Sequence, residues 1–393
     1  MWLGNTSVNL LLTEEQSMIQ DMAGKFARSE LAPVAAELDR GNDGTTFLSN
    51  LSKLAELGFM GMNTSADYGG TEAGTVAFSV AVTEIARACA STAVTMSVTN
   101  MVGEVIQTIG SEEQKSRYLP KLCSGEYPAA AFCLSEMGAG SDPASIKTRA
   151  VRVGDNWVLN GTKMWITSAG YAGVYVVWAV TDPALSKGKG ISCFLIEAGT
   201  AGLSIGPAEN KMGQHASITN SVIFEDCCIP ASALLGELND GYRVAVKELA
   251  GGRIGIGSLA LGVAQAAMDF AREYTVERKQ FNQIISEFQG IQWMLADAYT
   301  ELEAARLLLM SAAFLKEQGL PFMKQAAMAK VYATEAANRH CYTALQLMGG
   351  VGYTAEYPLE RYARDVRVTS IYEGTSEIQR LIIARELLKE IQP

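Results

Sequence analysis

The spacing of the apolar residues changes twice along this chain, and this change constrains its fold more than any other feature. Up to about residue 125 they recur at helical intervals, after a capping-box pattern at Thr13–Gln16. β-branched and aromatic residues then dominate to about residue 238, where the helical spacing returns. The sequence therefore predicts an α+β, mostly α chain: an N-terminal helical domain (1–128), a middle β-domain (129–238) and a C-terminal four-helix bundle (239–393).

The middle segment is expected to be antiparallel, because its connections lack the long helices that parallel pairing requires. Trp157–Leu159 and Thr162–Thr167 flank Asn160-Gly161, a strong signal for a two-residue hairpin. On the return strand, alternation would place Trp165 and Thr167 on one face, where an aromatic ring and a hydroxyl suit a flat polar ligand. Further strands are expected at 174–180, 191–196 and 221–224, and the C-terminal helices at 242–276, 288–316, 322–348 and 377–390.

The composition excludes several classes of function. A net charge of −10 and a pI near 5.0 argue against nucleic-acid binding, so a phosphate-bearing ligand must meet a local cluster of cations or peptide N–H groups. The seven cysteines form no C-x-x-C pair and suit reduced thiols in the core. The two histidines, His215 and His340, have no partners at metal-ligand spacing, which argues against a metal site or a Ser-His-Asp triad.

The N-terminal segment does not combine a basic start with an apolar core, so we expect no targeting segment. The longest uncharged stretch in the C-terminal half, 254–268, is too short to span a bilayer. These features predict a soluble, cytoplasmic protein of bacterial type without a membrane span.

A single carboxylate, Glu373, lies between Tyr372 and Gly374 in the stretch RVTSIYEGTSEIQR. The glycine frees the backbone, so this carboxylate and the neighbouring N–H groups could approach a ligand closely. Ser376 and Gln379 have the spacing of a capping box, which predicts that Glu373 precedes a helix N-terminus. From these residues alone, Glu373 is either a catalytic base or an ordinary solvated or capping carboxylate.

A glycine-rich turn, Ser135 to Asp142, lies where the chain enters the β-domain. Its two glycines and two hydroxyls could present N–H groups to an anion. The turn matches neither the dinucleotide-binding G-x-G-x-x-G pattern nor a P-loop, and a purely structural turn explains it equally well.

Five segments together resemble the acyl-CoA dehydrogenase family: FCLSEMGAGSD, KMWITSAG, ERKQFNQ, QLMGGVGYTAEYPLERYARD and IYEGTSEIQR. They occur in the family's order, and the similarity extends from the N-terminal helices to the last helix. The resemblance implies a helical domain, a β-domain and a four-helix bundle, usually in a homotetramer, with FAD between the β-domain and the bundle. Departures from the family pattern are Asn282 for Gly, His215 for Arg and Met137 for Pro. Asn282 tolerates the positive φ of a turn, whereas His215 puts a polar contact near the β-domain in doubt.

The resemblance also assigns candidate site residues. It implies that the cofactor contacts within one subunit are Phe132, Leu134, Ser135, Gly140, Ser141, Trp165, Thr167, Thr375 and Glu377. It implies contacts with the FAD of a neighbouring subunit from Arg278, Phe281, Gln346, Gly349 and Gly350. The CoA thioester would be bound by Ser141, Arg253, Tyr372, Gly374 and Arg385.

The mechanism that the resemblance implies uses Glu373 to take the α-proton of an acyl-CoA while the β-carbon passes hydride to flavin N5, giving trans-2-enoyl-CoA. Glutaryl-type members of the family hold the distal carboxylate of their substrate with an arginine in the helix before the G-S-E-E-Q turn. No Lys or Arg occurs between residues 88 and 110 of this chain, so the resemblance disfavours a dicarboxylyl substrate. The run RIGIG resembles short-chain and branched-chain members. We therefore expect a short-to-medium, branched or alicyclic uncharged acyl group. The resemblance, rather than any motif, implies electron-transferring flavoprotein as the acceptor. The alternatives are an enoyl-CoA reductase, an oxidase or a decarboxylating relative on the same scaffold, and a non-catalytic flavin or acyl-CoA binding scaffold.

Overall fold

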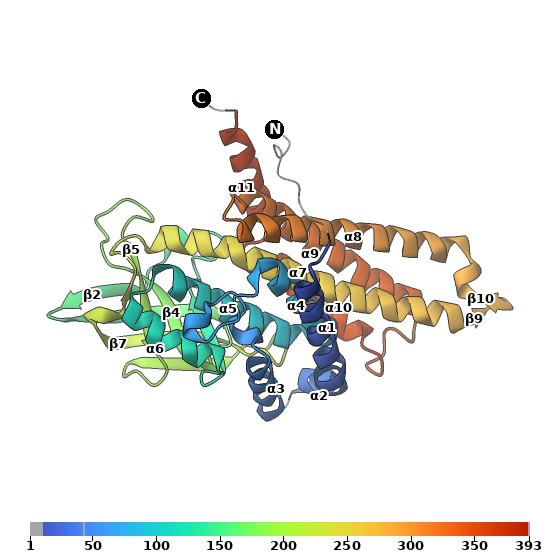
Figure 1. Cartoon of the computed structure of the whole chain (residues 1–393), viewed down its shortest axis with the longest axis horizontal. Helices are drawn as coiled ribbons and strands as arrows, with labels where there is room; N and C mark the ends of the chain where they lie inside the picture. Colours follow the sequence, from blue (N-terminus) through green and yellow to red (C-terminus); the bar gives the residue numbers. More distant parts are fainter. Residues whose placement is uncertain (1–10, 42–43, 392–393) are drawn as a thin grey trace. The chain divides into compact units, whose positions relative to one another are not determined.

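The computed structural model describes residues 11–41 and 44–391. The chain forms two compact units, each assembled from separate segments. Unit 1 comprises Met1–Asp39, Ala73–Ala93 and Arg253–Pro393, and unit 2 comprises Arg40–Glu72 and Val94–Gly252. The predicted fold class is confirmed, because helices precede and follow a central β region (Figure 1). The domain boundaries at 128 and 238 remain a prediction.

Unit 1 is helical, and its first helix has the predicted capping box. Thr13 Oγ1 accepts from Gln16 N at 3.2 Å, and Gln16 Oε1 accepts from Thr13 N at 3.0 Å. Pro33 interrupts this helical region as expected, because it lies in a 3-10 turn between two other helical segments. The helical elements up to α4 are α1 (Glu14–Phe26), the π-helical η1 (Ala27–Leu31), the 3-10 turn η2 (Ala32–Val34), α2 (Ala35–Arg40) and α4 (Gly74–Ala88).

The C-terminal part of unit 1 contains the predicted long helices and one that the sequence analysis missed, α10. Its elements are α8 (Gln289–Glu317), α9 (Met323–Met348), α10 (Leu359–Arg367), α11 (Ser376–Lys389), the 3-10 turns η7 (Ile285–Glu287) and η8 (Val368–Ser370), and the short strands β9 (Lys279–Gln280) and β10 (Gln283–Ile284). On α8 the apolar residues Ala298, Leu302, Ala305, Leu309 and Ala312, which recur at helical spacing, are buried. The helix α9 packs against α8, α10 and α11. The remaining long helix, α7 (Gly241–Glu277), begins in unit 2 and continues through unit 1.

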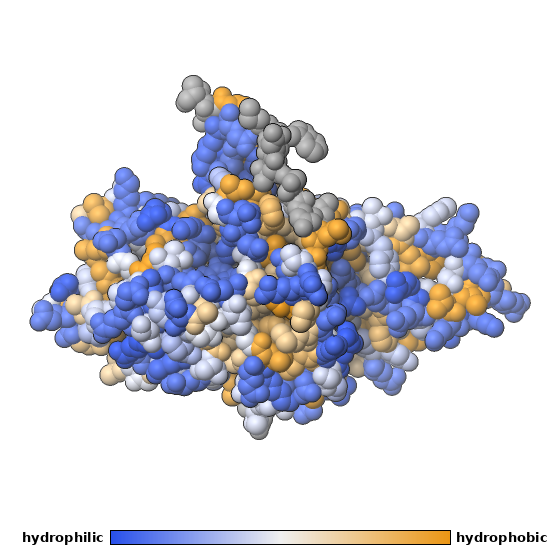
Figure 2. All heavy atoms as spheres, viewed as in Figure 1, coloured by the Kyte–Doolittle hydropathy of each residue, from blue (hydrophilic) through white to orange (hydrophobic). Residues whose placement is uncertain are grey.

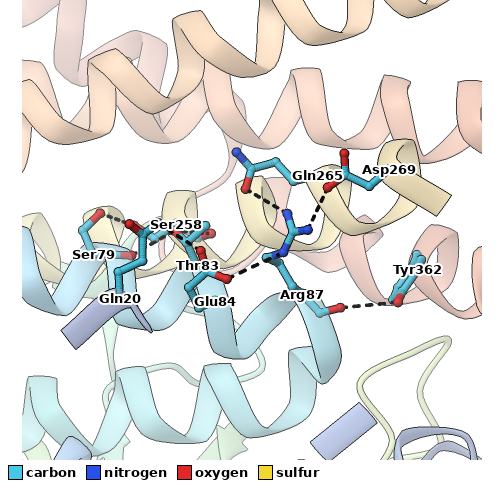
Figure 3. Close-up of polar contacts among 9 residues, drawn as sticks. All are labelled: Gln20, Ser79, Thr83, Glu84, Arg87, Ser258, Gln265, Asp269 and Tyr362. Atoms are coloured by element: carbon cyan, nitrogen blue, oxygen red, sulfur yellow. Dashed lines mark hydrogen bonds and ion pairs between the residues drawn. The ribbon is translucent and has the colours of Figure 1, made fainter. Parts of the chain in front are cut away.

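Glycines allow α7 to pack closely on its neighbours in unit 1. A Cβ at Gly257 would lie 2.5 Å from Leu309 Cδ2 of α8, and one at Gly262 would lie 2.1 Å from Thr83 O of α4. Figure 3 shows the polar contacts beside this packing, in which Arg87 of α4 donates to Asp269 of α7 at 2.7 Å. Small residues thus set the helix spacing, and a partly buried ion pair fixes the register of α4 on α7.

Within the described residues, α7 is the one helix that is long and apolar enough to cross a membrane. Of its most apolar 18-residue window, 78% is buried inside the protein. Core helices of soluble proteins have the same length and composition, so α7 is weak evidence for a membrane span.

Unit 2 contains an eight-stranded sheet accompanied by helices (Figure 1). The strand order is β6-β7-β3-β2-β4-β5-β8, and β1 pairs with β4. The strands are β1 (Ala129–Cys133), β2 (Arg149–Val153), β3 (Asn156–Thr167), β4 (Ala172–Val180), β5 (Ile191–Glu197), β6 (Leu203–Ala208), β7 (Thr219–Pro230) and β8 (Leu234–Leu235). The helical elements are α3 (Thr45–Glu56), α5 (Ala90–Ile109), which begins in unit 1, α6 (Glu112–Cys123), and the 3-10 turns η3 (Phe59–Gly61), η4 (Ala66–Tyr68), η5 (Pro143–Ser145) and η6 (Ala231–Ala233).

The expectation of purely antiparallel pairing is wrong at β4. Most strands do pair antiparallel, but β1 runs parallel to β4, and Arg149 of β2 pairs with Val180 of β4 in the parallel sense. The connection from β1 to β4 passes through β2 and β3, so two strands take the place of the crossover helix on which the expectation rested.

Both faces of β4 are buried, which explains its continuous apolar sequence. Val174, Val176 and Trp178 pack in a cluster with residues of α5, α6 and the start of α7. The alternate residues Tyr175 and Val177 pack in a second cluster with β3, β5 and β7. The strand therefore lies at the centre of unit 2.

The predicted hairpin at Asn160-Gly161 is wrong, because these residues lie inside the single strand β3. The pairing of β3 with β7 shifts register between Leu159 and Gly161, which marks a β-bulge. Asn160 Nδ2 donates to Asp226 Oδ1 at 3.1 Å, and Asp226 N donates to Asn160 Oδ1 at 2.8 Å. The side chain of Asn160 therefore stabilises a bulge here, and the turn between β2 and β3 occurs at Gly154-Asp155.

Candidate active site

Glu373 lies on a strained turn between η8 and α11. Its φ is +51°, a left-handed conformation that costs a non-glycine residue roughly 1–2 kcal/mol, and Gly374 follows with φ +91°. The predicted capping box of Ser376 and Gln379 is wrong: Thr375 is the N-cap, and its hydroxyl accepts from Ile378 N at 3.3 Å. Gln379 instead donates through Nε2 to Glu373 O at 3.2 Å and Gly374 O at 2.8 Å. The helix terminus thus binds the two carbonyls of the turn that carries Glu373.

The carboxyl group of Glu373 has the environment of a base that titrates near neutral pH. Its Oε2 atom is buried and has no hydrogen-bond partner in the described part of the chain. Burial raises the pKa of Glu373 to about 7, against the attraction of the cations Lys330 and Arg253, which lowers it. The carboxyl group is therefore close to half ionised at neutral pH.

Lys330 of α9 is fully buried, and Nζ donates to Gly374 O at 2.8 Å. Burial lowers the pKa of this ammonium to about 8, while the Glu373 carboxylate raises it. Neither the residue pattern nor the resemblance indicated this lysine.

Arg253 of α7 is 3% exposed, and its Nε and Nη1 have no partner among the described residues. Burial lowers its pKa to about 10, with Glu373 raising it and Arg385 lowering it. Arg385 itself is exposed on α11, and Tyr372 is half-buried beside Glu373. Buried donors without partners are uncommon, so those of Arg253 mark a position that suits a polar ligand.

The candidate cofactor residues of unit 2 begin in and just after β1. Phe132 is half-buried with its ring 4.2 Å from that of Trp178, and Leu134 is buried. Ser135 is half-buried, whereas Gly140 and Ser141 are exposed. A Cβ at Gly140 would meet nothing within 4 Å, so the backbone of this turn is open to a ligand.

Trp165 and Thr167 lie near the C-terminal end of β3, on either side of the buried Ile166. Trp165 is 48% exposed and has φ +58°, and the pairing of β3 with β7 is irregular between Lys163 and Ile166. A bulky residue with positive φ is strained, and such strain often marks a functional position.

A buried ion pair joins this part of β3 to the Ser135 turn. Lys163 is fully buried, and its Nζ donates to Glu136 Oε1 at 2.8 Å and to Leu134 O at 3.1 Å. Glu136 Oε2 also accepts from Lys147 N at 2.6 Å, and Met164 N donates to Ser135 O at 2.9 Å. The structure therefore brings the Ser135 turn and the Trp165 strand together within unit 2.

The remaining candidates lie in unit 1, at the C-terminal ends of α7 and α9 and in the turn between β9 and β10. Arg278 is exposed just after α7, and Phe281 is 89% exposed in the two-residue turn between β9 and β10. Asn282 has φ +64°, so the turn that was expected to survive the loss of Gly is present. Gln346, Gly349 and Gly350 are exposed at the end of α9. Figure 2 shows a small hydrophobic patch among hydrophilic residues at the β9–β10 end of the chain.

Three family models match successive parts of the sequence: the N-terminal domain of acyl-CoA dehydrogenase at residues 13–126, the middle domain at 131–227 and the C-terminal domain at 239–388. A mitochondrial short-chain specific acyl-CoA dehydrogenase of Mus musculus is 46% identical over 380 residues, which is 96% of this chain and 91% of the relative. This chain belongs to the acyl-CoA dehydrogenase family. Like its relatives, it is an enzyme.

Further relatives of this chain differ in their named activities. The acryloyl-CoA reductase (NADH) of Anaerotignum propionicum is 44% identical over 381 residues, covering 96% of this chain and 95% of the relative. Butyryl-CoA dehydrogenase of Megasphaera elsdenii has a TM-score of 0.93 at 37% identity, covering 97% of this chain and all of that one. A chain in the structure of the electron transferring flavoprotein of Acidaminococcus fermentans has a TM-score of 0.94 at 41% identity, with the same coverage. A glutaryl-CoA dehydrogenase of Mycobacterium smegmatis in complex with FADH2 has a TM-score of 0.89 at 30% identity, covering 96% and 95%.

Two buried lysines of this chain were missed from sequence, although each left a signal. Lys330 lies on α9 among Ala326, Ala329 and Ala333, all fully buried, so it interrupts an apolar stripe at helical spacing. Lys163 precedes Trp165 on β3. A lysine on a face that is otherwise apolar is expected to be buried, and a buried charge requires a polar partner. This pattern could have indicated both lysines from the sequence.

The two histidines make contacts within the protein. His215 Nε2 lies 2.7 Å from Lys211 O, and His340 Nε2 lies 2.8 Å from Glu301 Oε2. At position 215, where the family often has arginine, the histidine of this chain therefore contacts a backbone carbonyl four residues earlier.

Proposed function

We propose that this enzyme catalyses the FAD-dependent α,β-dehydrogenation of short, uncharged acyl-CoA thioesters to trans-2-enoyl-CoA, with Glu373 as the base. The observation that carries the proposal is the buried Glu373 carboxyl, whose pKa lies near neutrality and whose Oε2 has no partner among the described residues. The named activities of the short-chain and butyryl-CoA relatives support the substrate class. The absence of Lys and Arg between residues 88 and 110 supports an uncharged acyl group.

The residues in the candidate cofactor positions suit FAD. The open backbone at Gly140, Gly349 and Gly350, where a Cβ would meet nothing within 4 Å, suits groups that lie against the chain. The exposed indole of Trp165 suits a flat ring system. We propose that these residues hold FAD together with Phe132, Leu134, Ser135, Ser141, Thr167, Thr375 and Glu377, and that Arg278, Phe281 and Gln346 contact the FAD of a neighbouring subunit. When bound, FAD supplies the acceptor for the hydride that leaves the β-carbon.

The chain itself supplies the base and the groups that orient the thioester. Glu373 takes the α-proton, and a pKa near the working pH lets it hold that proton without becoming too weak a base. We propose that the peptide N–H of Glu373 donates to the thioester oxygen, where negative charge develops as the α-proton leaves. Arg253, Tyr372, Gly374, Ser141 and Arg385 are proposed to bind the CoA thioester.

A second candidate function is the reverse reaction, the reduction of an enoyl-CoA. The acryloyl-CoA reductase relative favours it, because it is 44% identical over almost the whole chain. The same residues serve both directions, since Glu373 in its protonated form would return the proton to the α-carbon. The reduction potential of the bound cofactor and the electron partner decide the direction.

We further propose that electron-transferring flavoprotein takes the electrons and that the enzyme is a homotetramer. The match to a chain in the Acidaminococcus fermentans flavoprotein structure supports the first proposal. The family resemblance supports the second.

The experiment is an anaerobic titration of the FAD-loaded enzyme with butyryl-CoA, in which bleaching of the flavin absorbance is followed. We expect rapid bleaching by the wild-type enzyme and none by Glu373→Gln, which keeps the shape of the side chain but cannot accept a proton. Glu303→Gln is the matched control, because Glu303 is an exposed carboxylate on α8. Rapid bleaching by Glu373→Gln would assign the base to another residue. A wild-type protein that no acyl-CoA in a panel of chain lengths can bleach would favour a binding scaffold.

A further inference from the structure

The turn that carries Glu373 is hydrogen-bonded to a buried lysine, Lys330, that no sequence motif indicated. Gly374 O accepts two hydrogen bonds, one from Lys330 Nζ and one from Gln379 Nε2, both at 2.8 Å. Lys330 and Gln379 are each fully buried, so water does not compete for these bonds.

The turn needs such support because its backbone is strained. Glu373 and Gly374 have φ values of +51° and +91°. A left-handed glutamate persists only where surrounding contacts outweigh its cost. Gln379 of α11 donates hydrogen bonds to the carbonyls of both Glu373 and Gly374, and Lys330 of α9 donates to that of Gly374.

The burial of Lys330 is costly, and packing alone does not explain it. Its neighbours on this face of α9, Ala326, Ala329 and Ala333, are fully buried and apolar, and an apolar residue would pack there without desolvating a charge. What the lysine adds is a donor to the turn and a positive charge near the Glu373 carboxyl.

We propose that Lys330 is a positioning residue for Glu373, which fixes the turn through the Gly374 carbonyl and supplies a cation that favours the ionised base. The proposal rests on the proposed function of Glu373. It extends that function, because it assigns a residue of another helix to the geometry and charge of the base.

The charges around Glu373 set the direction of the expected effect. Lys330 on α9 and Arg253 on α7 both lower the pKa of Glu373, in opposition to burial. Glu335 on α9 and Glu377 on α11 act on Lys330, and Arg385 on α11 acts on Arg253. Removal of Lys330 leaves one of the two cations, so the pKa of Glu373 rises. The ionised fraction at a given pH falls, and the acid limb of the rate profile moves to higher pH.

The test compares Lys330→Met with Gln379→Leu in the FAD-loaded enzyme. Both variants remove one donor to Gly374 O, but only Lys330→Met removes a charge. The limiting rate of flavin bleaching by butyryl-CoA is measured from pH 5.5 to 9, with FAD affinity and thermal unfolding measured in parallel. We expect the rate to fall at least about 10-fold in both variants, because a displaced base loses alignment with the α-proton. The acid limb should move up by about 1 pH unit in Lys330→Met alone.

Lys330→Gln keeps a polar donor without the charge and guards against a folding defect in Lys330→Met. It should show the pH shift with a smaller loss of rate. An unchanged rate and acid limb in both Lys330 variants would overturn the proposal. A loss of rate without a shift of the acid limb would also overturn the proposal. The same holds for a loss of rate that accompanies loss of FAD and a lower unfolding temperature, because a structural role alone produces these results. If Glu373→Gln still bleaches the flavin, the proposed base is wrong whatever the Lys330 variants do.

Discussion

Burial of Glu373 governs both its chemistry and its contribution to stability. The residue type and its place before a helix were visible in the sequence, and the family resemblance indicated its role. Its environment was not visible, because Lys330 and Arg253 approach it from helices about 40 and 120 residues away in sequence. Sequence patterns describe the face of one element, whereas the pKa of a buried group depends on what other elements place beside it.

The raised pKa of Glu373 predicts a pH-dependent change in stability for Glu373→Gln. The folded-state pKa is about 7 against an ordinary value of 4.5, so the stability linked to this group is present at low pH and is lost as pH rises through about 7. Glutamine resembles the protonated side chain and cannot ionise. The free energy of unfolding of the variant should therefore exceed that of wild type by up to about 3 kcal/mol at pH 8 and by less than about 1 kcal/mol at pH 5.

The measurement for this prediction is chemical denaturation of both proteins without substrate at the two pH values. Glu303→Gln serves as the control, and its difference from wild type should change little between them. A Glu373→Gln variant that gains nothing at pH 8 would show that the carboxyl is not buried as described.

At the scale of elements, periodicity predicted the long helices well, and local turn signals were less dependable. The capping box at Thr13 was confirmed, whereas the one predicted at Ser376 is wrong, because Thr375 is the N-cap of α11 and Ile378 at N3 cannot complete a box. Asn160-Gly161 has the composition of a hairpin turn, yet β3 continues through it. The same dipeptide suits a turn or a bulge, and the pairing partner β7, about 60 residues further on, decides between them.

Substitution of glycine by asparagine, which tolerates positive φ, should affect stability differently at the bulge in β3 and at the turn between β2 and β3. A Cβ at Gly161, where φ is +148°, would lie 2.7 Å from Thr148 Cα. A Cβ at Gly154, in the turn between β2 and β3 with φ +59°, would meet nothing within 4 Å. We therefore expect Gly161→Asn to lower the free energy of unfolding by about 2 kcal/mol or more and Gly154→Asn to change it by less than about 1 kcal/mol.

Denaturant unfolding followed by circular dichroism measures both variants. Equal effects at the two glycines, or a larger effect at Gly154, would contradict the placement of the turn and the bulge.

At the scale of the whole molecule, the order of helical and β segments followed from the sequence, and the family resemblance covered nearly the whole chain. The composition of the compact units did not follow, because residues 40–72 and 94–252 form one unit while 73–93 joins the other. Contiguous changes in composition cannot indicate such interleaving, since all of these N-terminal segments are helical.

Exposed aromatic side chains near the β9–β10 end of unit 1 predict that this surface is buried between subunits. Phe281 is 89% exposed and Trp293 of α8 is 63% exposed. Clusters of large exposed apolar side chains commonly mark interfaces. If the enzyme is the proposed homotetramer, Trp293→Glu places a charge in the interface and should dissociate it. Because Arg278 and Phe281 are proposed to contact the FAD of a neighbouring subunit, dissociation should also weaken FAD binding. Size-exclusion chromatography with light scattering and a flavin-to-protein absorbance ratio measure the two effects together.

Val151→Glu, at an exposed apolar position on β2 in unit 2, is the control and should leave both the tetramer and its FAD content unchanged. A Trp293→Glu protein that stays tetrameric and fully loaded with FAD would place the interface elsewhere, and a monomeric wild-type enzyme with tightly bound FAD would refute the shared cofactor site.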